Sequence, residues 1–320
     1  MIQRILVPLD GSQLAENAVP HAVALAKSLD AEITLLRVVE GRPSAAGCVD
    51  SLEWRLSWTE ASAYLEELAG RLDGLRVQTE LAQGKPPEQI IQFAQKANID
   101  LIALTTHGRG GLSEFELSGT AQKVIGAAGV SVLVVRVRDG VTVDREIRYR
   151  RILTPLDCSP RGDWALQVAA ALARRHGAEL CMAHVIPVPE MARRVSRTPE
   201  EDKLSRDVIE TNRRTASEYL AAEAIRISGP DLKVTTQIES GTQVAETLNE
   251  LARRQDVDLI VLSAHGATGR PTRPYGSVAT AMLIYGNNAI LVLQDAPRLT
   301  SERRTSDSWA RGLSESVVQR

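Results

Sequence analysis

The chain has 320 residues, a length typical of two domains of about 150 residues each, and 43% of them are hydrophobic, too many for a disordered chain. A formal net charge of -2 gives no field that would draw the protein to nucleic acid or to an anionic membrane, and no run approaches the ~18 apolar residues of a spanning helix. The N-terminus lacks a signal-type segment, and the three cysteines lack the spacing of a disulfide frame or a zinc site. We therefore expect a cytoplasmic protein without a metal site of its own.

Short apolar runs alternate with helical patterns along the first part of the chain. Strands are expected at 4–9, 32–39, 76–82, 100–105 and 132–137, and helices at 15–29, 52–72, 87–97 and 119–128. The strands are apolar throughout instead of alternating, which is typical of buried parallel strands. The pattern predicts a doubly wound α/β fold, with a parallel sheet and helices on both of its faces.

The second part of the chain repeats the first. The segment RILVPLDGS at 4–12 returns as RILTPLDCS at 151–159, and DLIALTTHGRGG from Asp100 returns as DLIVLSAHGATG from Asp258. The offset grows from 147 residues (151 − 4) to 158 (258 − 100), and we place most of the 11 additional residues (158 − 147) in a loop at 187–202. We predict a first copy at 1–138, a linker at 139–150, a second copy at 151–295 and a polar tail at 296–320.

Loops marked by aspartate and glycine follow the first and fourth strands of each copy. The first strands run into Asp10 and Asp157, and the fourth strands run into THGRGGLSEFELSGT and SAHGATGRPTRPYGS. If these strands are neighbours, their loops face one crevice at the carboxyl ends of the sheet, where open α/β sheets bind ligands. A helix that begins at Gly276 and Ser277 would point its free N–H groups into this crevice, which suits a phosphate group.

At this loop the chain resembles the universal stress protein family, over about residues 1–293. The nucleotide-binding members of that family share a pattern of Gly, two residues, Gly, nine residues, and then Gly followed by Ser or Thr. In the second copy Gly266, Gly276 and Ser277 fit this spacing, and Ser263 replaces the first glycine. The resemblance implies a nucleotide site in the second copy formed by Asp157, Val185, Ser263, Gly266, Gly269, Gly276, Ser277 and Val278.

The first copy departs further from the family pattern. Thr105 replaces the first glycine, Gly108 fits the second, and the final pair is inverted as Ser118-Gly119, with Thr120 one place later. We therefore expect the second copy to hold phosphate better. The corresponding candidates in the first copy are Asp10, Val38, Thr105, Gly108, Gly111, Ser118, Gly119 and Thr120.

The family also assigns parts of the ligand to these positions. The aspartates would lie beside the adenine and ribose, the backbone of the two valines would meet the adenine edge, and Gly84 and Gly241 would line the floor of the site. Structural roles stay open as alternatives. Asp10 and Asp157 could cap the first helices, Gly276 could merely start a helix, and Cys158 is read as an inert small residue.

The resemblance implies a five-stranded sheet of order 3-2-1-4-5 in each copy and a stress-response regulator that binds ATP or ADP, with an unidentified protein partner. A slow ATP hydrolase or another nucleotide-using enzyme is one alternative, and an interaction module with empty sites is another. The chain has no P-loop motif and no base placed beside the loop, so we expect at most weak ATPase activity. Mg²⁺ would be held only through the phosphates, since it keeps most of its waters.

The fifth strands, SVLVVR at 131–136 and AILVLQ at 289–294, are apolar and nearly free of charge. An open edge of this kind would aggregate, so edges are usually paired or covered. We predict that the two copies pair through these strands as an intrachain pseudo-dimer, and a homodimer of whole chains stays open.

Overall fold

The computed structural model describes residues 2–40, 51–106, 118–136, 146–188, 199–267 and 274–294. In the first copy the elements are β1 Arg4–Leu9, α1 Gln13–Glu16, α2 Ala18–Leu29, β2 Glu32–Val39, α3 Ser51–Gly70, β3 Val77–Gln83, α4 Pro86–Lys96, β4 Leu101–Thr105, α5 Gly119–Ala127 and β5 Ser131–Val135. In the second they are β6 Arg151–Pro155, α6 Gly162–His176, β7 Glu179–Pro187, α7 Pro199–Ile227, β8 Lys233–Gly241, α8 Val244–Arg254, β9 Leu259–Ser263, α9 Ser277–Tyr285 and β10 Ala289–Leu293.

All ten strands form one sheet, in the order β3-β2-β1-β4-β5-β10-β9-β6-β7-β8. Each copy is parallel and follows the order 3-2-1-4-5. The first and fourth strands are neighbours in both copies, with Ile5 opposite Leu101 and Ile152 opposite Leu259. The predicted fold class is therefore confirmed.

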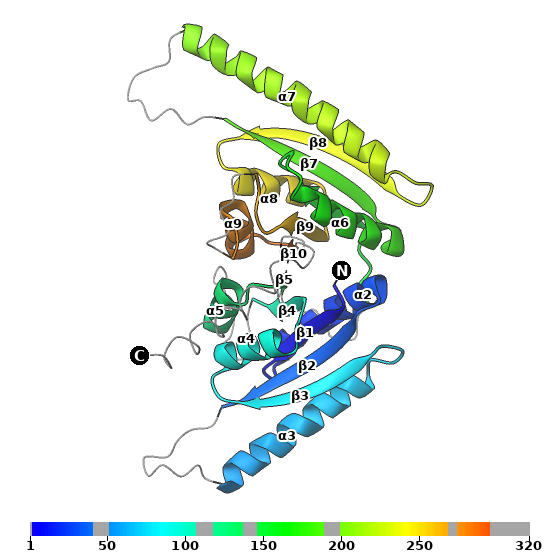
Figure 1. Cartoon of the computed structure of the whole chain (residues 1–320), viewed down its shortest axis with the longest axis vertical. Coiled ribbons are helices and arrows are strands. Elements are labelled where there is room, and N and C mark those ends of the chain that lie inside the picture. The colour runs from blue at the N-terminus through cyan, green and yellow to red at the C-terminus, as the bar shows by residue number, and fades with distance from the viewer. Residues whose placement is uncertain are drawn as a thin grey trace, which may run out of the picture.

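The two copies join through an antiparallel pairing of β5 with β10, which we call the seam. Leu133 lies opposite Leu291, and every residue of both strands is buried. The predicted intrachain pairing of the fifth strands is confirmed. Because the seam covers both apolar edges, the outer edges of the sheet are the more polar strands β3 and β8 (Figure 1).

Helices cover both faces of the sheet. One apolar cluster takes residues from α2, α3, α6 and α7, and the other takes residues from α4, α5, α8 and α9. Figure 1 shows α4, α5, α8 and α9 along one side of the sheet, with α3 and α7 beside the outer strands. Within the described parts of the chain, none of the helices has the length and hydropathy that a membrane crossing needs.

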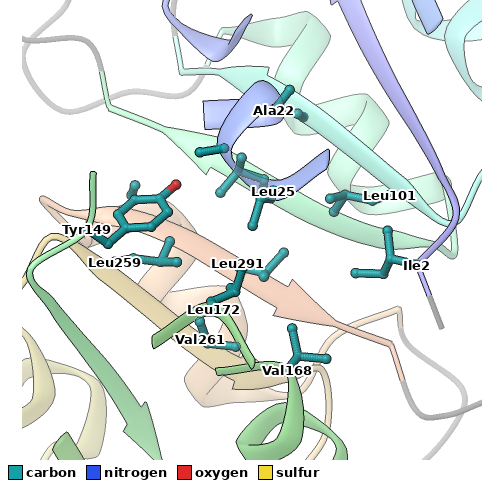
Figure 2. Packing of buried hydrophobic residues seen from close by; sticks show 14 of the residues in the cluster. Ile2, Ala22, Leu25, Leu101, Tyr149, Val168, Leu172, Leu259, Val261 and Leu291 are labelled. Atoms are coloured by element: carbon teal, nitrogen blue, oxygen red, sulfur yellow. The ribbon is translucent and has the colours of Figure 1, made fainter. Parts of the chain in front are cut away.

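The two copies also pack together through α2 and α6. Figure 2 shows Leu25 of α2, Leu172 of α6 and Tyr149 within this shared core, and all three are fully buried. Tyr149 belongs to the segment expected as a linker, yet its ring is part of the core. Its hydroxyl lies 2.9 Å from Nδ1 of His21, and burial lowers the pKa of His21 to about 4, so the histidine is neutral at pH 7.

The helix expected at 15–29 is broken in two. Ser12 caps α1 by accepting a hydrogen bond from Ala15 N at 3.2 Å, and Asn17 is the C-cap of α1. The Asn17 side chain donates to the carbonyl of Gln13 at 3.0 Å. A short amide side chain that bonds to nearby backbone in this way competes with the regular helical ladder.

The additional residues of the second copy lie mostly in a helix. Helix α7 has 29 residues against 20 in its counterpart α3, so 29 − 20 = 9 of the 11 additional residues lengthen this helix. The loop prediction is wrong for 199–202, which form the first turn of α7, while 189–198 lie outside the described residues. The segment PEED favours a helix start, because proline suits the first turn and carboxylates interact favourably with the helix N-terminus.

Candidate functional site

The aspartate loop and the loop before the last helix leave the sheet at the same edge in each copy. This follows because β1 and β4 are parallel neighbours, as are β6 and β9. In such sheets the strand order reverses between these strands, which opens a crevice at their carboxyl ends.

A cavity of about 1010 Å³ lies at this edge in the first copy. Its volume is at the upper end of the range of about 300–1,000 Å³ for small-molecule sites. Gly108 and Gly111 lie outside the described residues. The other six candidates of the first copy all line the cavity: Asp10, Val38, Thr105, Ser118, Gly119 and Thr120.

Charges of both signs line this cavity. Its basic residues are Arg37, Lys85 and Lys123, and its glutamates are Glu40, Glu60 and Glu88. Lys123 belongs to α5, whose N-terminus also lines the cavity, so the lysine and the helix dipole attract an anion to the same end.

Asp10 forms a tight turn with Ser12. Its Oδ1 accepts hydrogen bonds from Ser12 N at 2.9 Å and from Ser12 Oγ at 2.5 Å. Since Ser12 caps α1, the aspartate supports the helix through the serine and also lines the cavity. The capping role and a ligand contact are therefore not exclusive.

Asp157 repeats this turn and also reaches the loop after β9. Its Oδ1 accepts from Ser159 N at 3.1 Å and from Ser159 Oγ at 2.6 Å, while its Oδ2 accepts from Ala267 N at 2.5 Å. A Cβ built on Gly266 would lie 2.5 Å from that Oδ2. Glycine at position 266 therefore lets the Asp157 carboxylate approach the loop backbone, and a side chain there would displace that carboxylate.

The same loop joins α9 at Gly276, which is the N-cap. Gly276 N donates to Ala264 O at 2.7 Å, and this glycine has no side chain that could cap α9. The N-cap residue therefore does not compete with a ligand for the first N–H groups of the helix. Ser277 opens the helix and is followed by Val278, and Ser263 Oγ donates to His265 O at 2.9 Å. Gly269 lies outside the described residues.

Ser118 takes the place of Gly276 in the first copy. Ser118 N donates to Thr106 O at 2.8 Å, the counterpart of the Gly276–Ala264 bond. Its Oγ accepts from Ala121 N at 3.2 Å and so caps α5. The inversion in the sequence therefore puts the serine at the N-cap and Gly119 at the first helical position.

The valine and glycine candidates have mainly packing roles. Val38 and Val185 are only 9% and 7% exposed, so their backbone is what a ligand could meet. Gly84, expected on the floor of the site, does not line the cavity. A Cβ there would come within 3.0 Å of the Gln89 side chain, and one at Gly241 would collide with Thr247, so both glycines allow close strand–helix packing.

Sequence reasoning missed two residues that hold the ends of the first strands. Arg37 Nη1 donates to Leu9 O at 3.2 Å, and His184 Nδ1 donates to Leu156 O at 2.8 Å. Both precede the candidate valines, but the internal repeat does not mark them because the residue types differ.

The Cys158 thiol lies close to one of these residues. His184 Nδ1 also lies 3.6 Å from Cys158 Sγ. Burial and the charge of Asp157 raise the pKa of the Cys158 thiol, which keeps it protonated at neutral pH.

The sheet order and the crevice at its carboxyl edge define a doubly wound α/β protein, duplicated within one chain. A family model described as the universal stress protein family matches residues 1–136 and again 148–292. The chain therefore belongs to the universal stress protein family.

Relatives of single-copy length and a solved structure of nearly full coverage agree with this assignment. One universal stress protein of Methanocaldococcus jannaschii is 33% identical over 143 residues, covering 42% of this chain and 83% of that protein. Universal stress protein YxiE of Bacillus subtilis is 30% identical over 149 residues, covering 42% of this chain and all of that protein (100%). The crystal structure of a universal stress protein from Archaeoglobus fulgidus covers 92% of this chain and 100% of its own, with a TM-score of 0.62 and 20% identity, and supports the fold.

Proposed function

We propose that this protein is a stress-response regulator that binds ATP or ADP in the crevice of each copy, with a stronger phosphate contact in the second. The observation that carries the proposal is the cavity of the first copy. Six candidates chosen from four separate segments of the sequence line that one cavity, whose volume of about 1010 Å³ suits a nucleotide.

The phosphates would bind at the N-terminus of the last helix. The N-cap of α9 is a glycine, which supplies no side-chain cap, and this suits the binding of an anion by the N–H groups and dipole of the helix. In the first copy Ser118 Oγ already accepts one of these N–H groups, but Lys123 adds a positive charge nearby. The difference at the N-caps, serine in the first copy and glycine in the second, supports the second copy as the stronger phosphate site. Magnesium would be held through the phosphates.

The adenosine would lie toward the aspartate and the valine. Asp10 and Asp157 are each oriented by a serine, through hydrogen bonds of 2.5 Å and 2.6 Å from its hydroxyl. The backbone of Val38 and Val185 would meet the adenine edge. Both aspartates keep the same serine contacts, and Asp157 also bonds to Ala267 N in the loop after β9, so adenosine recognition is expected in both copies.

A slow ATP hydrolase is the second candidate, because three glutamates line the first cavity: Glu40, Glu60 and Glu88. A carboxylate can act as a general base if it reaches the attacking water. We expect turnover far below the ~1–10³ s⁻¹ of ordinary enzymes. Ordinary turnover that is lost in Glu60→Gln would favour the enzyme over the regulator.

The proposal is tested by denaturing the purified protein and separating the released small molecules by chromatography. We expect adenine nucleotide, and calorimetric titration should then show ATP and ADP binding to the stripped and refolded chain. Asp157→Ala should weaken binding, while Asp207→Ala, which removes an exposed carboxylate on α7, serves as the matched control. If no nucleotide is released and neither ATP nor ADP binds, the protein is better described as an interaction module with empty sites.

A further inference from the structure

The phosphate end of the second site is attached to the first copy. Tyr275, directly before the N-cap Gly276, is 5% exposed, and its hydroxyl donates to Val130 O at 2.9 Å. Val130 directly precedes β5, so this hydrogen bond links the second copy's loop to the first copy. Burial raises the pKa of Tyr275 well above its ordinary value, so the hydroxyl stays a donor at neutral pH.

A second hydrogen bond fixes the same stretch of loop. Gln294, which follows β10, donates through Nε2 to Pro274 O at 2.9 Å, and its backbone N donates to Ser131 Oγ at 3.1 Å. Pro274 and Tyr275 are therefore both held by residues at the seam. Because the seam strands are paired and buried, these attachment points are rigid.

Helix α5 connects the attachment point to the first site. Its first residue, Gly119, lines the cavity of the first copy, and the chain runs from its C-terminus to Val130. Figure 1 shows α5 and α9 on the same side of the sheet, one in each copy, and both contribute to one apolar cluster. Helix α5 and the hydrogen bond from Tyr275 to Val130 thus connect the phosphate ends of the two sites.

The sequence provides the tyrosine for this attachment in the second copy but not in the first. The residue before the N-cap is tyrosine in the second copy and Leu117 in the first, where 275 − 117 equals the offset of 158. A leucine side chain has no hydrogen to donate to a carbonyl. A hydroxyl contact of this kind is therefore available only to the second site.

We propose that Tyr275 is a positioning residue, which uses the first copy as its support to orient the N–H groups at the N-terminus of α9 and so strengthens phosphate binding in the second site. The inference rests on the proposed function, since it concerns the same nucleotide. It adds that the affinity of the second site for phosphate depends on a carbonyl of the first copy.

The test is Tyr275→Phe, which removes only the hydroxyl, made in a Gly119→Glu background so that the second site dominates the ATP titration. ATP and adenosine are titrated separately by calorimetry. We expect the Kd for ATP to rise about fivefold, the size of one lost neutral hydrogen bond, and the Kd for adenosine to change less than about twofold. Tyr285→Phe, at the 70% exposed tyrosine of the same helix, is the matched control and should change neither.

The comparison of ATP with adenosine separates positioning from a general loss of structure. An equal loss for both ligands, or no loss for ATP, overturns the inference. If the Gly119→Glu parent binds neither ligand, the proposed function itself fails and the inference fails with it. Should Tyr275→Phe not fold, Gln294→Leu removes the other loop contact, and the same selective loss of ATP affinity is required of it.

Discussion

The two copies share one fold, but their last helices begin differently. In the first copy Ser118 caps α5 with its own Oγ, whereas Gly276 leaves α9 without a side-chain cap. A serine cap stabilises a helix by about 1 kcal/mol relative to alanine but occupies an N–H group that an anion would otherwise bind. Exchanging two neighbouring residues thus changes a helix start from a capped end into a candidate phosphate site.

A second difference lies where α2 and α6 pack. His21 in the first copy corresponds to Val168 in the second, since 168 − 21 equals the offset of 147. The histidine bonds to the buried Tyr149, while the valine lies in the same core as an apolar side chain (Figure 2). The polar pair makes this interface sensitive to protonation, which an apolar pair would not be.

The largest expected effect concerns the different N-termini of α5 and α9. Gly276→Glu should weaken ATP binding more than about 100-fold, because a carboxylate repels phosphate and two hydrogen bonds to charged groups are worth about 1.5–3 kcal/mol each. Gly119→Glu should cost about tenfold or less, since that site is already capped. Calorimetric titration with ATP measures both.

Circular dichroism is the control for folding. A Cβ at Gly276 would lie 3.3 Å from Ala264 O, which is tight, whereas among the described residues no atom lies within 4 Å of one at Gly119. A larger loss in Gly119→Glu than in Gly276→Glu would reverse the ranking of the two sites.

The next effect concerns the interface of α2 with α6. Burial lowers the pKa of His21 from 6.5 to about 4, so its contribution to stability is complete above pH 6.5 and is lost as the pH falls toward 4. The loss amounts to about 3 kcal/mol at most. Urea unfolding at pH 7 and pH 4.5 should show a smaller pH dependence in His21→Gln than in the parent chain. An identical pH dependence would show that His21 is not protonated on unfolding.

A smaller effect is expected from a substitution that makes the N-cap of α5 resemble that of α9. Ser118→Gly removes the hydroxyl that accepts from Ala121 N and leaves that N–H for a phosphate. We expect ATP affinity at the first site to rise about fivefold, while the free energy of unfolding falls by only a few tenths of a kcal/mol. Titration in a Gly276→Glu background isolates this site, and unchanged affinity there would contradict the capping argument.

The smallest effect concerns the turn after the first strand. Cys158 has a φ of +60°, and its counterpart in the first copy is Gly11, with a φ of +73°. This left-handed conformation costs a side chain roughly 1–2 kcal/mol, and glycine loses about 0.5–1 kcal/mol to its flexible unfolded state. Cys158→Gly should therefore stabilise the chain by about 0.5 kcal/mol in urea unfolding. A net destabilisation would mean that the thiol contact with His184 matters more than the strain.

The sequence by itself determined the duplicated α/β fold. Strands β1 and β2 have the expected bounds to the residue, because their apolar runs are bounded by turn residues nearby in the chain. The repeated Asp and Gly positions also indicated which loops meet, since parallel strands deliver their carboxyl ends to one edge. The break at Asn17 and the added length of α7 were missed, because local polar patterns fit either a loop or a helix start.

Only the tertiary structure decided which of these residues touch. Ala267 and Asp157 are 110 residues apart, His21 and Tyr149 are 128 apart, and Tyr275 and Val130 are 145 apart. Each contact joins different loops or different copies, and nothing in the local pattern of either partner specifies it. The pairing of β6 with β9 brings the first pair together within the second copy. The packing of α2 on α6 and the pairing of β5 with β10 bring the other two pairs together across the copies.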